Sequence, residues 1–197
     1  LKHKECFCPA FINHFGLQGV SGFARETWEF VNLYSKTRGA NRFVAVVEAL
    51  HLLNDRPPVL QQLGGPIDTS ELEEWIEGET RLSGPVLGEF LEARQDTIPA
   101  DSILRASLAW SNDVMAAVKR IVHDLPPIAE AAQALEKIKG QADCVVVSQT
   151  PSADLVREWE EHDIARFTRM IAGQEQGTKT EHLALAAGSK YEEGHVL

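Results

Sequence analysis

The stretch "CVVVSQTPS", residues 144–152, decides the predicted fold. Three β-branched valines follow Cys144 and run directly into small hydroxyl and amide side chains. Because β-branched residues favour strands, residues 143–147 are predicted to form a buried strand. A proline and a helical pattern follow, which raises the question of why a buried strand should end in a polar tip.

The part of the chain around this strand alternates between helical and extended patterns. The alternation begins after His123-Asp124-Leu125-Pro126-Pro127. The predicted elements are a helix over 128–139, a strand over 143–147, a helix over 152–162, a short strand over 166–172, a Gly-rich turn over 173–177, a helix over 178–188 and a strand from 194. Strands separated by helices at this spacing predict βαβ units and a parallel sheet.

The part of the chain before residue 123 has a different pattern, with apolar residues mainly at three- and four-residue steps. This spacing predicts helices over 4–16, 24–36, 41–54, about 70–79, 85–94 and 101–122. Asp55-Arg56-Pro57-Pro58 is expected to end a helix, and a loop containing Gly64-Gly65-Pro66 follows. Residues 18–122 are therefore predicted to be an all-helical block.

Composition limits the classes of function. The 197 residues carry 19 Lys and Arg against 29 Asp and Glu, a formal net charge of −10. An acidic surface repels phosphate backbones, so nucleic acid is not expected as a partner, although a local basic pocket can still hold a small phosphorylated ligand.

The expected location is the cytoplasm. Three sparse cysteines fit a reducing compartment, and Cys6-x-Cys8 has no second Cys/His pair at metal-ligand spacing. No apolar run approaches the ~20 residues of a membrane span, and there is no signal peptide, so no membrane association is expected. The seven histidines show no ligand spacing, and none is assigned a role.

The polar tip of the predicted strand is a candidate phosphate-binding elbow. In an open parallel sheet, ligands bind beyond the carboxyl ends of the strands. Ser148, Gln149 and Thr150 follow the strand directly, and their hydroxyl and backbone N–H groups are able to donate to an anion, helped by the N-terminus of the next helix. The alternative is that Ser and Thr simply cap the helix over 152–162, and taken alone that interpretation is preferred.

A second feature favours the phosphate site. "GQEQGTKTEHLALAAG", residues 173–188, is a Gly-rich turn that places Lys179 at the start of a helix. A lysine there opposes the helix dipole, which is more easily understood if the lysine faces an anion.

These features together resemble the haloacid dehalogenase-like (HAD) hydrolase superfamily. Ser148 in "VVVSQT" matches the strand-terminal Ser or Thr of the family's second motif. Lys179 in "GTKTEHLALAA" matches the lysine of the third motif, 31 positions later. The resemblance implies an α/β fold, a Rossmann-like three-layer core with a parallel sheet, plus an all-helical cap domain. Residues 1–17 and 123–197 would form the core, and residues 18–122 the cap.

The family's activity is phosphoryl transfer through an aspartyl-phosphate, with Mg²⁺ as cofactor. By resemblance, Ser148 would donate a hydrogen bond to the phosphoryl group and Lys179 would neutralise its charge. Losing Lys179 should therefore lower kcat/KM more than losing Ser148. The first motif, Asp-x-Asp, does not occur in the 197 residues, and the metal-binding fourth motif would follow residues 194–197. Both motifs are expected outside the given residues, so no metal ligand is predicted within them.

Within the predicted helical block, "NLYSKTRGANRF", residues 32–43, is the candidate substrate-facing turn. It gathers Tyr34, Lys36, Arg38 and Arg42 between two apolar helices. Arg38 is the preferred contact to an anionic or polar leaving group, because the break at Gly39 would hold it. The alternative is a solvated turn between two helices.

The predicted function is a Mg-dependent phosphatase acting on a small phosphorylated metabolite. The alternatives are a dehalogenase or phosphonatase of the same superfamily, the latter with Lys36 as a weak Schiff-base candidate, and a non-catalytic binding or regulatory protein. The oligomeric state is not predicted by the sequence.

Overall fold

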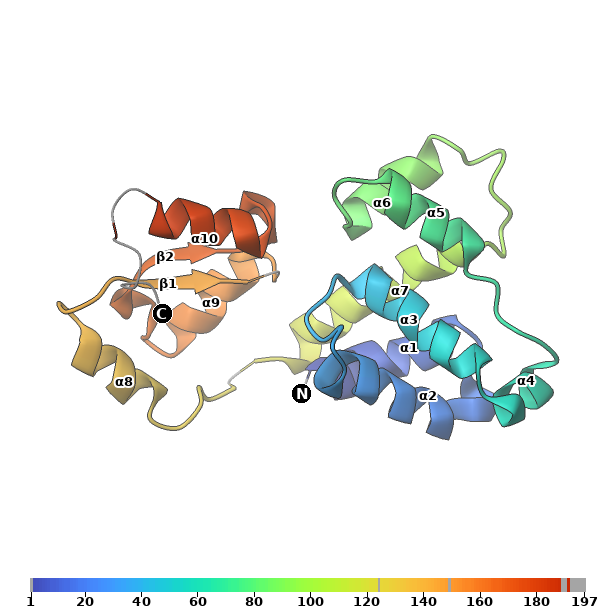
Figure 1. The fold of residues 1–197 in the computed structure, drawn as a ribbon, viewed down its shortest axis with the longest axis horizontal. Coiled ribbons are helices and arrows are strands. Elements are labelled where there is room, and N and C mark those ends of the chain that lie inside the picture. Colours follow the sequence, from blue (N-terminus) through green and yellow to red (C-terminus); the bar gives the residue numbers. More distant parts are fainter. Residues whose placement is uncertain (1, 124, 149, 189–190, 192–197) are drawn as a thin grey trace. The chain divides into compact units, whose positions relative to one another are not determined.

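The chain folds mainly into helices (Figure 1). The structure is a computed structural model that describes residues 2–123, 125–148, 150–188 and 191. Helix accounts for 64% of it, and its described part contains ten α-helices and a two-stranded parallel sheet. The prediction of a Rossmann-like three-layer core is therefore wrong for the described residues.

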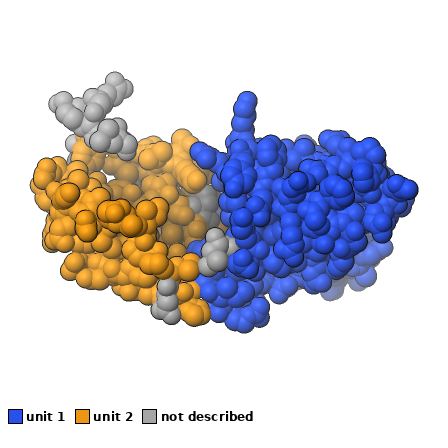
Figure 2. Space-filling model, turned by 90° about the horizontal axis from the view of Figure 1, so that it is seen from below, with its two compact units in different colours: residues 1–122 blue, residues 123–197 orange. Residues whose placement is uncertain are grey.

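The chain divides into two compact units, residues Leu1–Val122 and His123–Leu197 (Figure 2). The division falls at the predicted change of pattern after Val122. Residues 3–14, which we assigned to the α/β half, pack in the structure against two helices of the first unit, Ser21–Glu29 and Ile103–Ile121.

The first unit, called the helical unit below, contains seven α-helices among its described residues. They are α1 Cys8–His14, α2 Ser21–Glu29, α3 Arg42–Asn54, α4 Pro57–Leu63, α5 Ser70–Gly78, α6 Gly84–Glu92 and α7 Ile103–Ile121. Short π-helical turns, His3–Phe7 and Phe30–Tyr34, precede α1 and follow α2.

Most of these helices lie where the apolar spacing predicts them, and their ends have local causes. Asn41 accepts a hydrogen bond from the Phe43 amide at the start of α3, and Ser102 accepts one from the Leu104 amide at the start of α7. Helix α4 was missed. Pro57 and Pro58 do follow the end of α3, but they also occupy the first positions of a new helix, where a missing N–H costs nothing.

The core of the helical unit is aromatic. Trp28 and Trp110 are fully buried with ring centroids 5.8 Å apart, and Phe11 and Phe43 pack against this pair. The Trp110 indole N–H donates to the Phe7 carbonyl at 3.3 Å, which joins α7 to the start of the chain. Burial of such large side chains supplies most of the stability expected of this unit.

The second unit, called the α/β unit below, contains α8 Ala131–Ile138, β1 Cys144–Val147, α9 Ser152–Glu161, β2 Thr168–Ala172 and α10 Lys179–Ala187. β1 and β2 pair in parallel, with Val147 opposite Ala172. Helix α9 packs against β2 and α10 against β1 (Figure 1).

The predicted βαβ connection is thus present, whereas the described residues form no larger sheet. A three-layer core needs a sheet of several strands covered on both faces. The described part of this unit supplies two short strands, and every side chain of β1 is only half-buried. The strand predicted from residue 194 lies outside the described residues.

Among the described residues, no helix combines the length and the apolar character needed to cross a membrane.

Candidate functional site

The two segments that follow β1 and β2 lie side by side. The Ser148 amide donates to the Ala172 carbonyl at 3.0 Å, which continues the ladder past the end of β1. The Gln174 amide donates to the Thr150 carbonyl at 3.1 Å. The carboxyl ends of two parallel strands therefore meet at one edge, as the sequence predicted, and we call this edge the strand-end site. Gln149, the third predicted elbow residue, lies outside the described residues.

Ser148 has a defined side-chain orientation. Its hydroxyl oxygen accepts a hydrogen bond from the Thr150 amide at 3.1 Å, which closes a small turn. A serine hydroxyl has one proton to donate, and no hydrogen bond among the described residues uses it. The half-buried side chain is therefore able to donate to an oxyanion at the end of β1.

The N-terminus of α9 is occupied by a carboxylate from the neighbouring segment. Glu175 accepts from the Ser152 amide at 2.9 Å and from the Ser152 hydroxyl at 2.7 Å. Pro151 is the N-cap, and no side-chain cap bond is made at that position. Ser148 and Thr150 do not cap α9 as the alternative supposed. The Ser152 amide already donates to Glu175, so it does not donate to a phosphate.

The contact between Glu175 and Ser152 changes the acidity of the carboxyl group. Partial burial acts to raise the pKa of Glu175, but the hydrogen bonds from the Ser152 amide and hydroxyl outweigh it, and the pKa is lowered. The carboxylate is therefore a fixed negative charge at the edge of the strand-end site.

Gly173 allows the two segments to approach this closely. A Cβ atom at this position would lie 2.5 Å from the Ser152 hydroxyl oxygen and 2.6 Å from the Ser152 nitrogen. The Gly173 amide donates to the Gln176 side-chain oxygen at 2.8 Å. The same oxygen also accepts from the Ser152 hydroxyl. The first glycine of the Gly-rich turn is thus required by close packing of backbone on backbone.

Lys179 is the first residue of α10, where the pattern predicts it. Thr178 is the N-cap: its hydroxyl accepts from the Glu181 amide at 3.3 Å, and the Glu181 carboxylate accepts from the Thr178 amide at 2.7 Å. This capping box fixes the start of the helix, and the Glu181 carboxylate favours the positive end of its dipole. The Lys179 side chain is exposed, and it forms no ion pair with any of the described residues. Its role toward a phosphate, like that of Ser148, stays a prediction.

His182 is a residue that sequence analysis missed. It lies three positions after Lys179 on α10, is 2% exposed, and neither ring nitrogen has a hydrogen-bond partner in the part of the chain that the structure describes. The only signal in the sequence is its spacing from Lys179, which places both residues on neighbouring positions of one helix.

The turn chosen as substrate-facing in the helical unit is largely solvated. Tyr34 is 72% exposed, and Lys36 and Arg38 are also exposed. The turn is closed by Ser35, whose hydroxyl donates to the Val31 carbonyl at 2.7 Å. Arg42 differs from the other three because it is half-buried on α3. A substrate role for these four residues stays a prediction.

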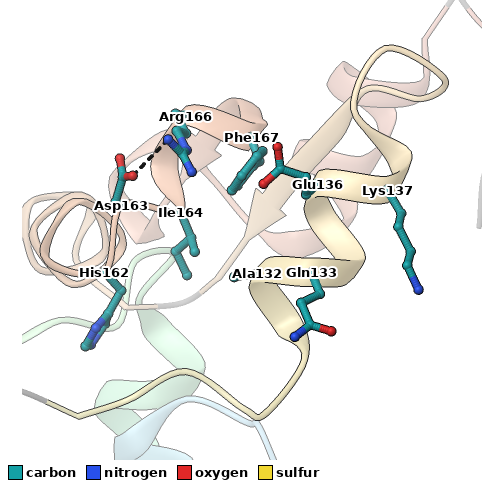
Figure 3. Close-up of a pocket in the computed structure, with 9 residues that line it drawn as sticks. All are labelled: Ala132, Gln133, Glu136, Lys137, His162, Asp163, Ile164, Arg166 and Phe167. Atoms are coloured by element: carbon teal, nitrogen blue, oxygen red, sulfur yellow. Dashed lines mark ion pairs between the residues drawn. The ribbon is translucent and has the colours of Figure 1, made fainter.

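A pocket of about 380 Å³ lies elsewhere in the α/β unit (Figure 3). Its lining comes from α8 and from the segment before β2: Ala132, Gln133, Glu136, Lys137, His162, Asp163, Ile164, Arg166 and Phe167. Asp163 and Arg166 form an ion pair at 3.0 Å across its rim. The segment from His162 to Phe167 precedes β2, so the pocket opens at the amino end of that strand, away from the strand-end site.

The described residues offer no metal site: none of their His, Cys, Asp and Glu side chains gather in a group of three or more. They therefore supply no set of ligands for the Mg²⁺ that the HAD resemblance implies.

Comparison of the chain with protein-family models, with curated proteins and with solved structures gave no match.

Proposed function

We propose that the strand-end site binds the phosphoryl group of a small phosphorylated metabolite, as part of a phosphatase of the HAD type. One observation carries this proposal. The parallel pairing of β1 and β2 brings Ser148 beside the start of the turn that leads from Ala172 to Lys179, and the Ser148 hydroxyl, which accepts from the Thr150 amide, keeps its own O–H available to donate to a ligand.

Each residue would act on the phosphoryl group in a different way. Ser148 would donate one hydrogen bond to a phosphoryl oxygen. Lys179 would supply the positive charge that a phosphate needs, and this charge becomes more valuable as negative charge spreads over the phosphoryl oxygens during transfer. Glu175 would repel an anion placed at the N-terminus of α9, which favours binding on the Ser148 side.

Phosphate binding is the first test, because it needs no nucleophile. Inorganic phosphate is titrated into the chain and amide shifts around Ser148 and Gln174 are followed by NMR. We expect Lys179→Ala to weaken binding about tenfold or more, since hydrogen bonds to charged groups are the strong ones, and Ser148→Ala to weaken it less.

The matched control is Lys137→Ala, which removes the same charge from the pocket at the amino end of β2. It should leave phosphate affinity unchanged. Equal losses for Ser148→Ala and Lys179→Ala would overturn their ranking, and the absence of saturable shifts near Ser148 would overturn the proposal itself.

Activity separates the phosphatase from its alternatives. Small phosphorylated metabolites are screened for release of inorganic phosphate, with and without added magnesium. Magnesium-dependent release supports the phosphatase. Saturable phosphate binding without turnover supports the non-catalytic binding protein, and halide release from haloacids supports the dehalogenase.

A further inference from the structure

Arg42 is a half-buried cation without a carboxylate partner. Its guanidinium lies over the Phe7 ring, 5.5 Å from the centroid, and its Nη1 donates to the Ser111 hydroxyl oxygen over a long 3.4 Å. No ion pair to Arg42 is formed by any residue that the structure describes. Other cations of the same unit are satisfied: Arg56 pairs with Glu26 at 2.8 Å, and Arg105 donates to three backbone carbonyls.

An unpaired guanidinium in partly desolvated surroundings is costly. Burial lowers the pKa of Arg42 from its ordinary value, which reflects the cost of holding the charge there. The side chain nevertheless stays protonated, because guanidinium does not lose its proton in proteins. An anion beside it would remove that cost.

Two further polar groups at this place are uncommitted. Ser111 is 2% exposed, and no acceptor for its hydroxyl proton exists among the described contacts. His3, whose ring lies 4.9 Å from that of Phe7, has a buried Nδ1 without a partner in the described chain. Burial, followed by nearby positive charge that includes Arg42, lowers the pKa of His3. Buried polar atoms without partners are rare, because each one loses its hydrogen bonds to water and gains none from the protein.

The backbone around these side chains is also electropositive. Arg42 is the first residue of α3, and Gly84 is the first residue of α6. Asn41 donates to the Leu82 carbonyl at 2.8 Å, and a Cβ on Gly84 would lie 3.2 Å from the Ser111 hydroxyl. The N-termini of two helices, of nine and thirteen residues, thus border the same group of side chains, and both favour negative charge.

We propose that Arg42, Ser111 and His3 form a binding site for the oxyanion of a small molecule, a carboxylate or a phosphate. The planar guanidinium offers two parallel N–H groups to such an oxyanion, and its stacking on Phe7 holds it in place for bidentate contact. The Ser111 hydroxyl, which accepts from Arg42, would donate a hydrogen bond through its own O–H to the same anion. The site uses residues of the helical unit alone and does not rest on the proposed function of the α/β unit.

The test is a titration of the chain with sodium phosphate and, separately, sodium acetate, at ionic strength held constant with chloride. The Lys179→Ala background is used to weaken phosphate binding at the strand-end site. Binding is followed through the ring protons of His3 by NMR. We expect saturable shifts with at least one of the two anions, and the one that binds more tightly identifies the oxyanion.

Variants locate the binding at Arg42. Arg42→Gln should lower the affinity tenfold or more, whereas Arg42→Lys and Ser111→Ala should lower it by smaller factors. Arg56→Gln is the matched control, because Arg56 also stacks on a phenylalanine, Phe23, at 5.5 Å but is paired with Glu26. It should leave the affinity unchanged.

The outcomes that overturn the site are distinct. No saturable shift with either anion overturns it, as do equal losses in Arg42→Gln and Arg56→Gln. Circular dichroism checks that each variant is folded, and if Arg42→Gln is not, the charge-preserving Arg42→Lys and the smaller change Ser111→Ala decide the question.

Discussion

The contacts that stabilise the helical unit internally differ in kind from those that stabilise the α/β unit internally. In the helical unit, the side chains of Trp28, Trp110 and their aromatic neighbours fill a continuous core. In the described part of the α/β unit, the buried apolar side chains are Leu155, Ile164 and Ala172, and the loops after the strands are joined by hydrogen bonds and by contact at Gly173. The volume of the buried side chains should therefore govern the stability of the helical unit. Hydrogen bonds and the close approach of two backbone segments should govern the stability of the α/β unit.

The largest effect is expected from truncating the core of the helical unit. Trp110→Ala should lower the free energy of unfolding by about 3–5 kcal/mol, because it leaves a cavity among four aromatic rings and frees the Phe7 carbonyl. Urea unfolding followed by far-UV circular dichroism measures this. The same change at the half-buried Trp159 of α9 should cost less, and equal losses would break the contrast between the units.

The next effect tests the close approach in the α/β unit. Gly173→Ala should cost about 1–3 kcal/mol, because the new Cβ would collide with the backbone of Ser152. Faster hydrogen exchange at the Ser148 and Gln174 amides should accompany the loss. Gly22→Ala in α2 is the control, since its Cβ meets nothing within 4 Å, and it should be neutral or slightly stabilising. Unchanged exchange in Gly173→Ala would contradict the packing argument.

The smallest effect is a dependence on pH. Glu175 has a lowered pKa in the folded chain, so its contribution to stability is present above its ordinary pKa of about 4.3 and is lost as pH falls through the lower, folded value. Glu175→Gln should be less stable than the wild type at pH 7, and the difference should shrink as the medium becomes more acidic.

Urea midpoints at neutral and acidic pH measure this difference. Glu160→Gln is the control, because Glu160 is exposed and its side chain makes no hydrogen bond or ion pair within the described residues. It should stay within about 0.5 kcal/mol of the wild type throughout. If Glu175→Gln is less stable than the wild type by the same amount at every pH, the charge of Glu175 does not explain the loss.

Features with a local cause could be predicted from the sequence. Three valines before Ser148 and the start of α10 at Lys179 are local patterns, and the structure has both. Helix α4 was missed because two prolines after a helix look like an end, although they serve equally well as a beginning.

Features that depend on tertiary contacts could not. The three-layer core is what the resemblance to the HAD superfamily implies, whereas the described residues form a sheet of two strands. The bond from Ser152 to Glu175 and the burial of His182 arise only when separate segments meet. The same holds for Arg42, which is half-buried and donates to Ser111, 69 positions later in the sequence.

The contact between Trp110 and the Phe7 carbonyl has a consequence for the order of folding during synthesis. The two residues are 103 positions apart, so the helical unit keeps an incomplete core until α7 has left the ribosome. The apolar faces of the helices made earlier lack their α7 contacts for that time. By contrast, Cys144 pairs with Thr168 only 24 positions later, and that pairing requires only a short segment of chain.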